Sequence, residues 1–120
     1  MVGNLNNKTC VPCQGGINPL PSDEAEEYKT QTPKWDLVEK SSKLKREFKF
    51  DNFKHSLKFI ERVGAIAEEE GHHPDIEFGW GYARIYIYTH EINGLHENDF
   101  ILASKTVSYT HLTLPTIYSV

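Results

Sequence analysis

The chain has 120 residues, of which 38% are hydrophobic and 25% are charged, and its net charge is −4. These values predict one soluble globular domain and exclude a disordered chain. No apolar run approaches the ~20 residues of a membrane-spanning helix, and no signal peptide is visible, so we expect a cytoplasmic protein. The acidic balance argues against direct binding to nucleic acid.

The only two cysteines, Cys10 and Cys13, have the spacing CxxC. A zinc site needs further ligands, and none lies nearby in the sequence. A redox pair usually opens a helix after a strand, and no strand precedes this one. We predict a structural or incidental role, with both thiols reduced in the cytosol.

The first third of the chain contains one predicted helix and no internal repeat. Residues 1–20 are rich in Asn, Gly and Pro and are predicted to be irregular. Ser22 is the expected cap of a helix that ends before Pro33.

A hairpin follows, with strands at Trp35–Val38 and Leu44–Phe50 joined across Glu39–Lys43. The second strand alternates between two faces. One face carries Leu44, Arg46, Phe48 and Phe50, and the other carries Lys45, Glu47 and Lys49.

Asp51 is the predicted cap of the longest helix, and Gly71 is its predicted end. Apolar residues at spacings of four and three form a stripe that we expect to cover a sheet: Phe53, Leu57, Ile60, Val63 and Ala67. His55 lies off this stripe and is predicted to be solvated.

The remaining elements are a strand at Asp75–Phe78, a turn at Gly79-Trp80-Gly81, a strand at Ala83–Tyr88, a turn at Asn93-Gly94 and a helix at Glu97–Lys105. The element order is helix, two strands, helix, two strands, helix. It predicts a two-layer α+β fold, in which helices cover one face of a four-stranded antiparallel sheet.

The stretch Gly71-His72-His73-Pro74-Asp75 carries the functional prediction. Pro74 keeps His73 out of the helical region. Adjacent side chains on an extended backbone point to opposite sides, so His72 and His73 could line two walls of one pocket. His90 ends a predicted strand and could add a third imidazole, which suits proton transfer near neutral pH. The alternative is three surface histidines at element ends, because spacing alone does not show that they converge.

The chain from residue 10 to residue 105 resembles the pterin-4a-carbinolamine dehydratases. The matching pieces are Trp35-Asp36-Leu37, Phe48-Lys49-Phe50, Glu70-Gly71-His72-His73-Pro74-Asp75, Thr89-His90, Gly94-Leu95 and Asn98-Asp99-Phe100. The resemblance implies a 4a-hydroxytetrahydrobiopterin dehydratase, a lyase of tetrahydrobiopterin recycling. Such an enzyme removes water from a 4a-hydroxytetrahydropterin to give the quinonoid dihydropterin. It also implies no metal, no redox cofactor, and a homodimer or homotetramer.

The resemblance places the catalytic residues at His72, His73 and His90. Loss of hydroxide needs a proton donor at the leaving oxygen, and a ring nitrogen must lose a proton. Such acid–base groups typically contribute about 10²–10⁴-fold. We predict that His72 and His90 are the acid–base pair and that His73 positions the substrate.

Two further residues are predicted to bind substrate. Asp99 is one, with an imidazole-orienting role or a role as an exposed first-turn acid as alternatives. Trp35 is the other, as a wall of the pterin pocket or, alternatively, as a core residue. Glu68 and His96 are predicted to be solvated surface residues.

The end of the chain departs from the family pattern. After the last predicted helix the sequence continues as residues 107–120, which resemble translated sequencing-adapter sequence. We therefore predict three parts: an irregular segment at 1–20, a dehydratase-like domain at 21–106, and a non-native tail at 107–120.

Two other functions are compatible with the sequence. One is a dimerisation cofactor or binding module without catalysis, since some relatives serve as dimerisation cofactors for a transcription factor. The other is a metal site built from His72, His73 and His90.

Overall fold

The sheet is the centre of the computed structural model, which describes residues 18–113 and 118–119, with side chains described for 18–106. Its strands β1 (Asp36–Val38), β2 (Lys43–Lys49), β3 (Asp75–Gly79) and β4 (Tyr82–Ile87) are antiparallel, in the order β1-β2-β4-β3. A two-residue strand, β5 (Tyr118–Ser119), pairs with the end of β2.

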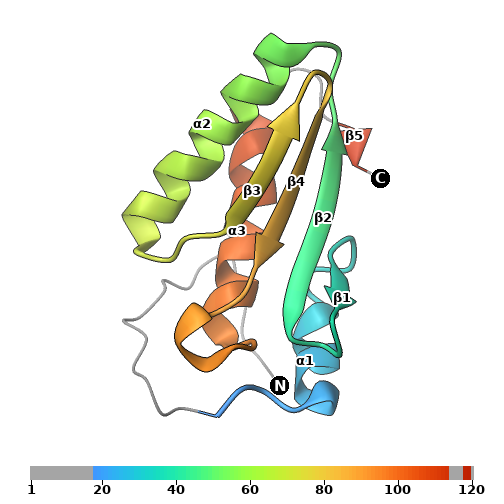
Figure 1. Cartoon of the computed structure of the whole chain (residues 1–120), viewed down its shortest axis with the longest axis vertical. Coiled ribbons are helices and arrows are strands. Elements are labelled where there is room, and N and C mark those ends of the chain that lie inside the picture. The colour runs from blue at the N-terminus through green and yellow to red at the C-terminus, as the bar shows by residue number, and fades with distance from the viewer. Residues whose placement is uncertain (1–17, 114–117, 120) are drawn as a thin grey trace.

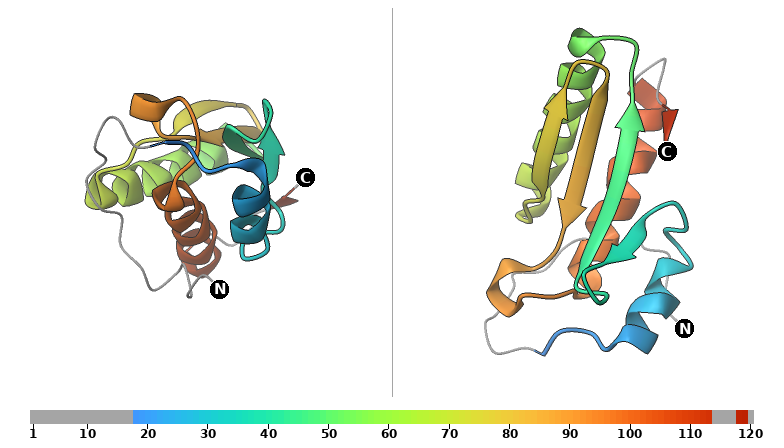
Figure 2. Two further views of the ribbon diagram at one scale, coloured as in Figure 1. Left: turned by 90° about the horizontal axis from the view of Figure 1, so that it is seen from below. Right: turned by 45° about the vertical axis from the view of Figure 1, so that its right-hand side comes forward.

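Three helices lie on one face of this sheet: α1 (Ser22–Lys29), α2 (Phe53–Glu70) and α3 (Glu97–Thr113) (Figures 1 and 2). A short 3₁₀ helix, η2 (His90–Ile92), follows β4. The predicted two-layer α+β fold is confirmed. No helix among the described residues combines the length and apolarity that a membrane crossing requires.

The register of β2 against β4 separates an apolar face from a polar one. Leu44, Phe48, Ile85 and Ile87 are fully buried under the helices. The predicted alternation of β2 is confirmed, and it includes Arg46, which is buried with its guanidinium over the Phe48 ring at 4.6 Å. Burial lowers the pKa of the Arg46 guanidinium.

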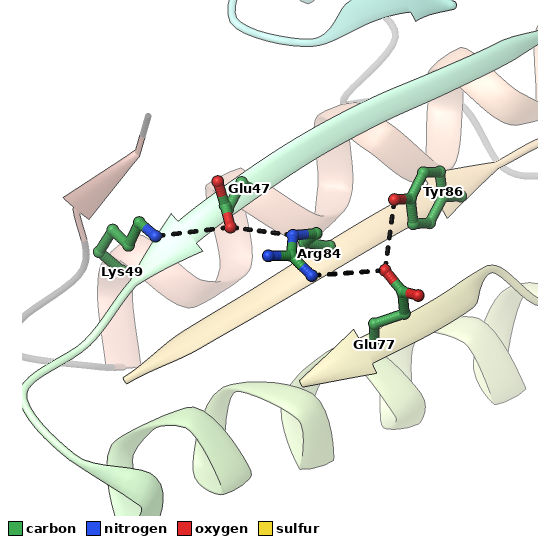
Figure 3. Close-up of polar contacts among 5 residues, drawn as sticks. All are labelled: Glu47, Lys49, Glu77, Arg84 and Tyr86. Atoms are coloured by element: carbon green, nitrogen blue, oxygen red, sulfur yellow. Dashed lines mark hydrogen bonds and ion pairs between the residues drawn. The ribbon is translucent and has the colours of Figure 1, made fainter. Parts of the chain in front are cut away.

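The other face of the sheet carries a polar network centred on Arg84 (Figure 3). Its Nε donates to Glu47 at 3.0 Å, its Nη1 lies 3.7 Å from Glu77, and Lys49 also reaches Glu47 at 3.5 Å. Desolvation lowers the pKa of the Arg84 guanidinium, but the carboxylates of Glu47 and Glu77 outweigh it and raise that pKa overall. The cations of this network are thus already paired within the protein.

Helix α2 buries a face that is rotated from the predicted stripe. Its buried residues are Ser56, Phe59, Val63, Ile66 and Ala67. The Phe59 ring packs 4.5 Å from Phe48 and 5.1 Å from Phe50. Phe53 and Leu57 are 47% and 38% exposed, so the prediction was wrong for these two residues. The helix is apolar on two adjacent faces. The face that packs against the rings of Phe48 and Phe50 is the buried one.

The caps of the first two helices also differ from the predictions. Ser22 is the first residue of α1 rather than its cap, and Pro21 precedes it in an extended conformation. Asn52, not Asp51, caps α2: its side chain accepts a hydrogen bond from the His55 backbone N–H at 2.9 Å. Asp51 instead lies 3.8 Å from the His55 ring, in an exposed contact.

Helix α3 extends to Thr113, beyond the predicted end at Lys105. The end of the chain therefore includes helix and the short strand β5. The assignment of residues 107–120 as non-native stays a prediction, which resequencing of the source transcript tests.

The Asn52 cap gives a stability prediction. Asn52→Ala removes the acceptor for the His55 N–H and should lower the free energy of unfolding by about 1 kcal/mol. Asp51→Ala is the control and should change it by less than about 0.5 kcal/mol, because that side chain is exposed. Urea denaturation of both variants measures the difference. A larger loss for Asp51→Ala would contradict the assignment of the cap.

Candidate active site

Four chain segments meet at one end of the sheet. The C-terminal end of α2, the start of β3, the end of β4 and the start of α3 lie together there (Figure 1). All three predicted catalytic histidines belong to these segments.

Gly71 ends α2 in the left-handed conformation (φ 66°), which a residue with a side chain adopts only at a cost. The following His72 N–H donates back to the Ala67 carbonyl at 3.1 Å. His72 is 8% exposed, whereas the side chain of His73 is 60% exposed. The two neighbours therefore have opposite environments, as the extended backbone predicts.

Asp99 is the fully buried carboxylate that organises the site. Its Oδ1 lies 2.6 Å from His72 Nε2. Its Oδ2 accepts hydrogen bonds from the Thr89 hydroxyl and from the His96 backbone N–H, both at 2.8 Å. One side chain thus joins the end of α2, the residue before His90 and the start of α3.

Asp99 also stabilises the first turn of α3. It is the third residue of a helix that begins at Glu97, and it accepts from the N–H of His96, the residue just before the helix. This is the acidic half of a capping box, which satisfies a backbone donor that the helix leaves free. The structural and site roles of Asp99 are therefore inseparable.

The other two histidines also contact carboxylates, but in exposed positions. His73 Nε2 lies 2.5 Å from Glu68 Oε2, where both side chains are more than half exposed. His90 Nε2 lies 3.4 Å from Asp75 Oδ1, where the side chains are 50% and 55% exposed. Each predicted catalytic histidine thus has one carboxylate, and only that of His72 is buried.

The loop that carries His90 is closed by a β-bridge between Thr89 and Gly94. Asn93 turns the chain in the left-handed conformation (φ 50°). A Cβ on Gly94 would lie 2.5 Å from the Pro19 ring, so only glycine fits under the N-terminal segment. These contacts hold the loop that carries His90, and the His90 ring lies 4.2 Å from that of Tyr88.

The two predicted substrate-binding residues are both buried. Trp35 is 1% exposed and packs edge-on against Phe48 in the core, which favours the core role. Asp99 has both oxygens engaged by protein donors, which favours an orienting role over direct contact with substrate.

Other predicted residues have mixed outcomes. His96 is half-buried rather than simply exposed, and its Nδ1 has no hydrogen-bond partner among the described residues. Cys10 and Cys13 lie outside the described residues. Within the described part of the chain, no three His, Cys, Asp or Glu side chains are grouped so as to hold a metal ion.

Sequence reasoning gave no role to four residues around the site: Thr89, Glu68, Asp75 and Tyr88. Thr89 precedes His90 in the motif Thr89-His90. Its hydrogen bond to Asp99 joins two residues that are ten positions apart in the sequence, so the motif alone did not indicate it. Glu68 lies one helical turn before His72, and this position was its only signal.

The chain matches the family model described as pterin 4 alpha carbinolamine dehydratase over residues 18–109. The chain belongs to this family. Dehydratases are lyases, so the chain is a member of an enzyme family. The matched range contains all of the site residues described above.

Individual relatives agree with the family model. A protein of Methylococcus capsulatus named "Putative pterin-4-alpha-carbinolamine dehydratase" is 55% identical over 101 residues, which cover 84% of this chain and 89% of the relative. A protein of the same name from Halorhodospira halophila is 54% identical, covering 84% and 93%. The crystal structure of a transcriptional coactivator/pterin dehydratase from Brucella melitensis has a TM-score of 0.70 at 27% identity, covering 76% of this chain and 97% of that one.

Two of these carboxylates, one buried and one exposed, give a prediction about stability. Asp99→Ala leaves His72, Thr89 and the His96 N–H without their acceptor in a buried site, and should cost about 3–5 kcal/mol of unfolding free energy. Glu68→Ala removes an exposed carboxylate from the equivalent contact with His73 and should cost less than about 1 kcal/mol.

Urea denaturation compares the two variants. Thr89→Val, which removes a single donor, should lie between them at about 1 kcal/mol. Equal effects of Asp99→Ala and Glu68→Ala would contradict the organising role of Asp99.

Proposed function

We propose that this protein catalyses the dehydration of a 4a-hydroxytetrahydropterin to the quinonoid dihydropterin by histidine acid–base catalysis. Membership of the dehydratase family supports the reaction and the substrate class. The observation that carries the mechanism is the buried carboxylate of Asp99, which contacts His72 directly and accepts a hydrogen bond from Thr89, the residue before His90 in the chain.

His72 is the proposed base. A hydrogen bond from its Nε2–H to Asp99 leaves Nδ1 as the nitrogen that can accept a proton. The carboxylate holds the ring in one orientation and one tautomer, which is the role that an orienting acid has in other histidine sites. His72 then takes the proton from the ring nitrogen of the pterin.

His90 is the proposed acid. It lies at a half-exposed position, with Asp75 on one nitrogen and the Tyr88 ring beside it. From there it gives a proton to the hydroxyl that leaves carbon 4a, so that water departs. His73, in contact with Glu68, holds the substrate against these two groups.

The mechanism predicts different kinetic effects for the three histidines. His72→Ala and His90→Ala should each lower kcat by about 10²–10⁴-fold, because each removes a proton-transfer group. His73→Ala should raise KM more than it lowers kcat, because it removes a positioning contact. Steady-state dehydratase assays measure both parameters.

His55→Ala is the matched control. This histidine also contacts a carboxylate, Asp51, but lies at the start of α2, and its removal should leave kcat and KM unchanged. Full activity of His72→Ala would exclude the mechanism. An inactive wild-type protein would favour the alternative of a binding module or dimerisation cofactor.

We also propose that the protein forms a homodimer or homotetramer. Among the residues whose side chains the structure describes, the exposed large apolar ones are Phe53, Leu57 and Trp80. Strand β3 is at the edge of the sheet and leads into the turn that holds Trp80. An open edge and apolar side chains beside it favour pairing with a second copy.

Sedimentation tests this assembly. The wild-type chain should sediment as an oligomer, and a Phe53→Ser, Leu57→Ser double variant should shift toward the monomer, because both apolar groups lie on the exposed face of α2. Lys54→Ser with Lys58→Ser, on the same helix, is the control. A monomeric wild type would contradict the proposal.

A further inference from the structure

Side chains at the end of β4 alternate between the interior and the surface. Thr89 is fully buried and donates to Asp99, whereas Tyr88 before it is half-buried and His90 after it is exposed. The hydrogen bond of Thr89 therefore holds the backbone beside His90 but does not touch the imidazole. Other contacts must set the orientation of that ring.

Two contacts act on the His90 ring itself. The centre of the Tyr88 ring lies 4.2 Å from that of His90, with the two planes inclined by 43°. On its edge, His90 Nε2 lies 3.4 Å from Asp75 Oδ1. With Nε2 turned toward this carboxylate, Nδ1 is the nitrogen that remains available to a ligand.

The carboxylate alone is a weak restraint. The side chains of His90 and Asp75 are 50% and 55% exposed, and ion pairs at such exposure contribute little. Packing between aromatic rings does not depend on charge, and it adds to the gain from burial. Tyr88 thus supplies a second restraint on the imidazole, against the ring rather than at its edge.

Tyr88 is itself held from the neighbouring strand. Leu44 of β2 faces Ile87 of β4, so Lys43 and Tyr88 form the next facing pair in this antiparallel register. Lys43 Nζ lies 4.6 Å from the centre of the Tyr88 ring, a cation–π contact, and 3.3 Å from Glu39 Oε2.

These contacts form a continuous series from the β1–β2 turn to the proposed acid. The β1–β2 turn and η2 lie at the same end of the sheet (Figures 1 and 2). Glu39 contacts Lys43, Lys43 contacts Tyr88, and Tyr88 contacts His90. None of the first three residues is needed to transfer a proton, so their effect on the reaction passes through the His90 ring.

We infer that Tyr88, held by Lys43, is a positioning residue that orients the His90 imidazole for proton transfer. The inference rests on the proposed function, because it requires His90 to be the acid. A proton is transferred only when donor and acceptor lie within hydrogen-bond reach and in line. A small displacement of a reacting group can cost up to about 10²-fold in rate.

The first test separates kcat from KM. Tyr88→Ala should lower kcat about tenfold and leave KM unchanged, because the ring contact orients His90 and does not bind substrate. Tyr88→Phe keeps the ring and should restore wild-type kcat. Tyr82→Ala is the matched control. Tyr82 also has a cation over its ring, Arg84 at 4.7 Å, but it begins β4 at the end far from His90, so both parameters should stay unchanged.

A double-mutant cycle tests whether Tyr88 acts through His90. In a His90→Ala background, Tyr88→Ala should cause no further loss of kcat. Lys43→Met should lower kcat about threefold in the wild type and have no effect in the Tyr88→Ala background. A tenfold loss from Tyr88→Ala that persists without His90 would overturn the inference, because Tyr88 would then act on the substrate directly.

Nuclear magnetic resonance gives a readout that does not depend on activity. The His90 ring protons lie beside the Tyr88 ring, so Tyr88→Ala should move their resonances, and Tyr82→Ala should not. Unchanged His90 resonances in Tyr88→Ala would overturn the inference and leave the proposed function standing. A wild-type protein with the expected His90 shift but without dehydratase activity would instead overturn the proposed function.

Discussion

The buried carboxylate of Asp99 is the interaction on which the site depends. A buried carboxylate is costly unless donors surround it, and here the donors come from three different segments. Satisfying Asp99 therefore requires the end of α2, the end of β4 and the start of α3 to come together. The energetic need of one side chain fixes the relative positions of His72 and the Thr89-His90 pair.

Backbone constraints then decide the environment of each histidine. The left-handed Gly71 ends α2 so that His72 turns toward Asp99, while His73 remains exposed beside Glu68. Close packing of Pro19 over Gly94 holds the loop that carries His90. One imidazole is thus buried and held in one orientation, and the other two are accessible from solvent.

Local patterns in the sequence predicted most of the fold. The alternation of β2, the glycine at the end of α2 and the turn residues before β4 are consequences of one or two neighbouring residues. The failures concern choices made in three dimensions. Phe53 and Phe59 are equally apolar, and only the rings of Phe48 and Phe50 decide that Phe59 is buried. The contact of His72 with Asp99 spans 27 residues, so spacing did not predict it, and the family resemblance placed Asp99 at the site without indicating which histidine it contacts.

The two faces and one end of the sheet differ in how many of their polar groups have hydrogen-bond or ion-pair partners within the protein. On the open face, Arg84 and Lys49 are paired with Glu47 and Glu77, so that face offers few unpaired charges. On the covered face, the side chains are mostly apolar and closed to solvent. At the end of the sheet, His73 and His90 each hold a single carboxylate and remain at least half exposed. Accessible groups that can still exchange protons and hydrogen bonds with a ligand are concentrated there, next to the one histidine that Asp99 holds in place.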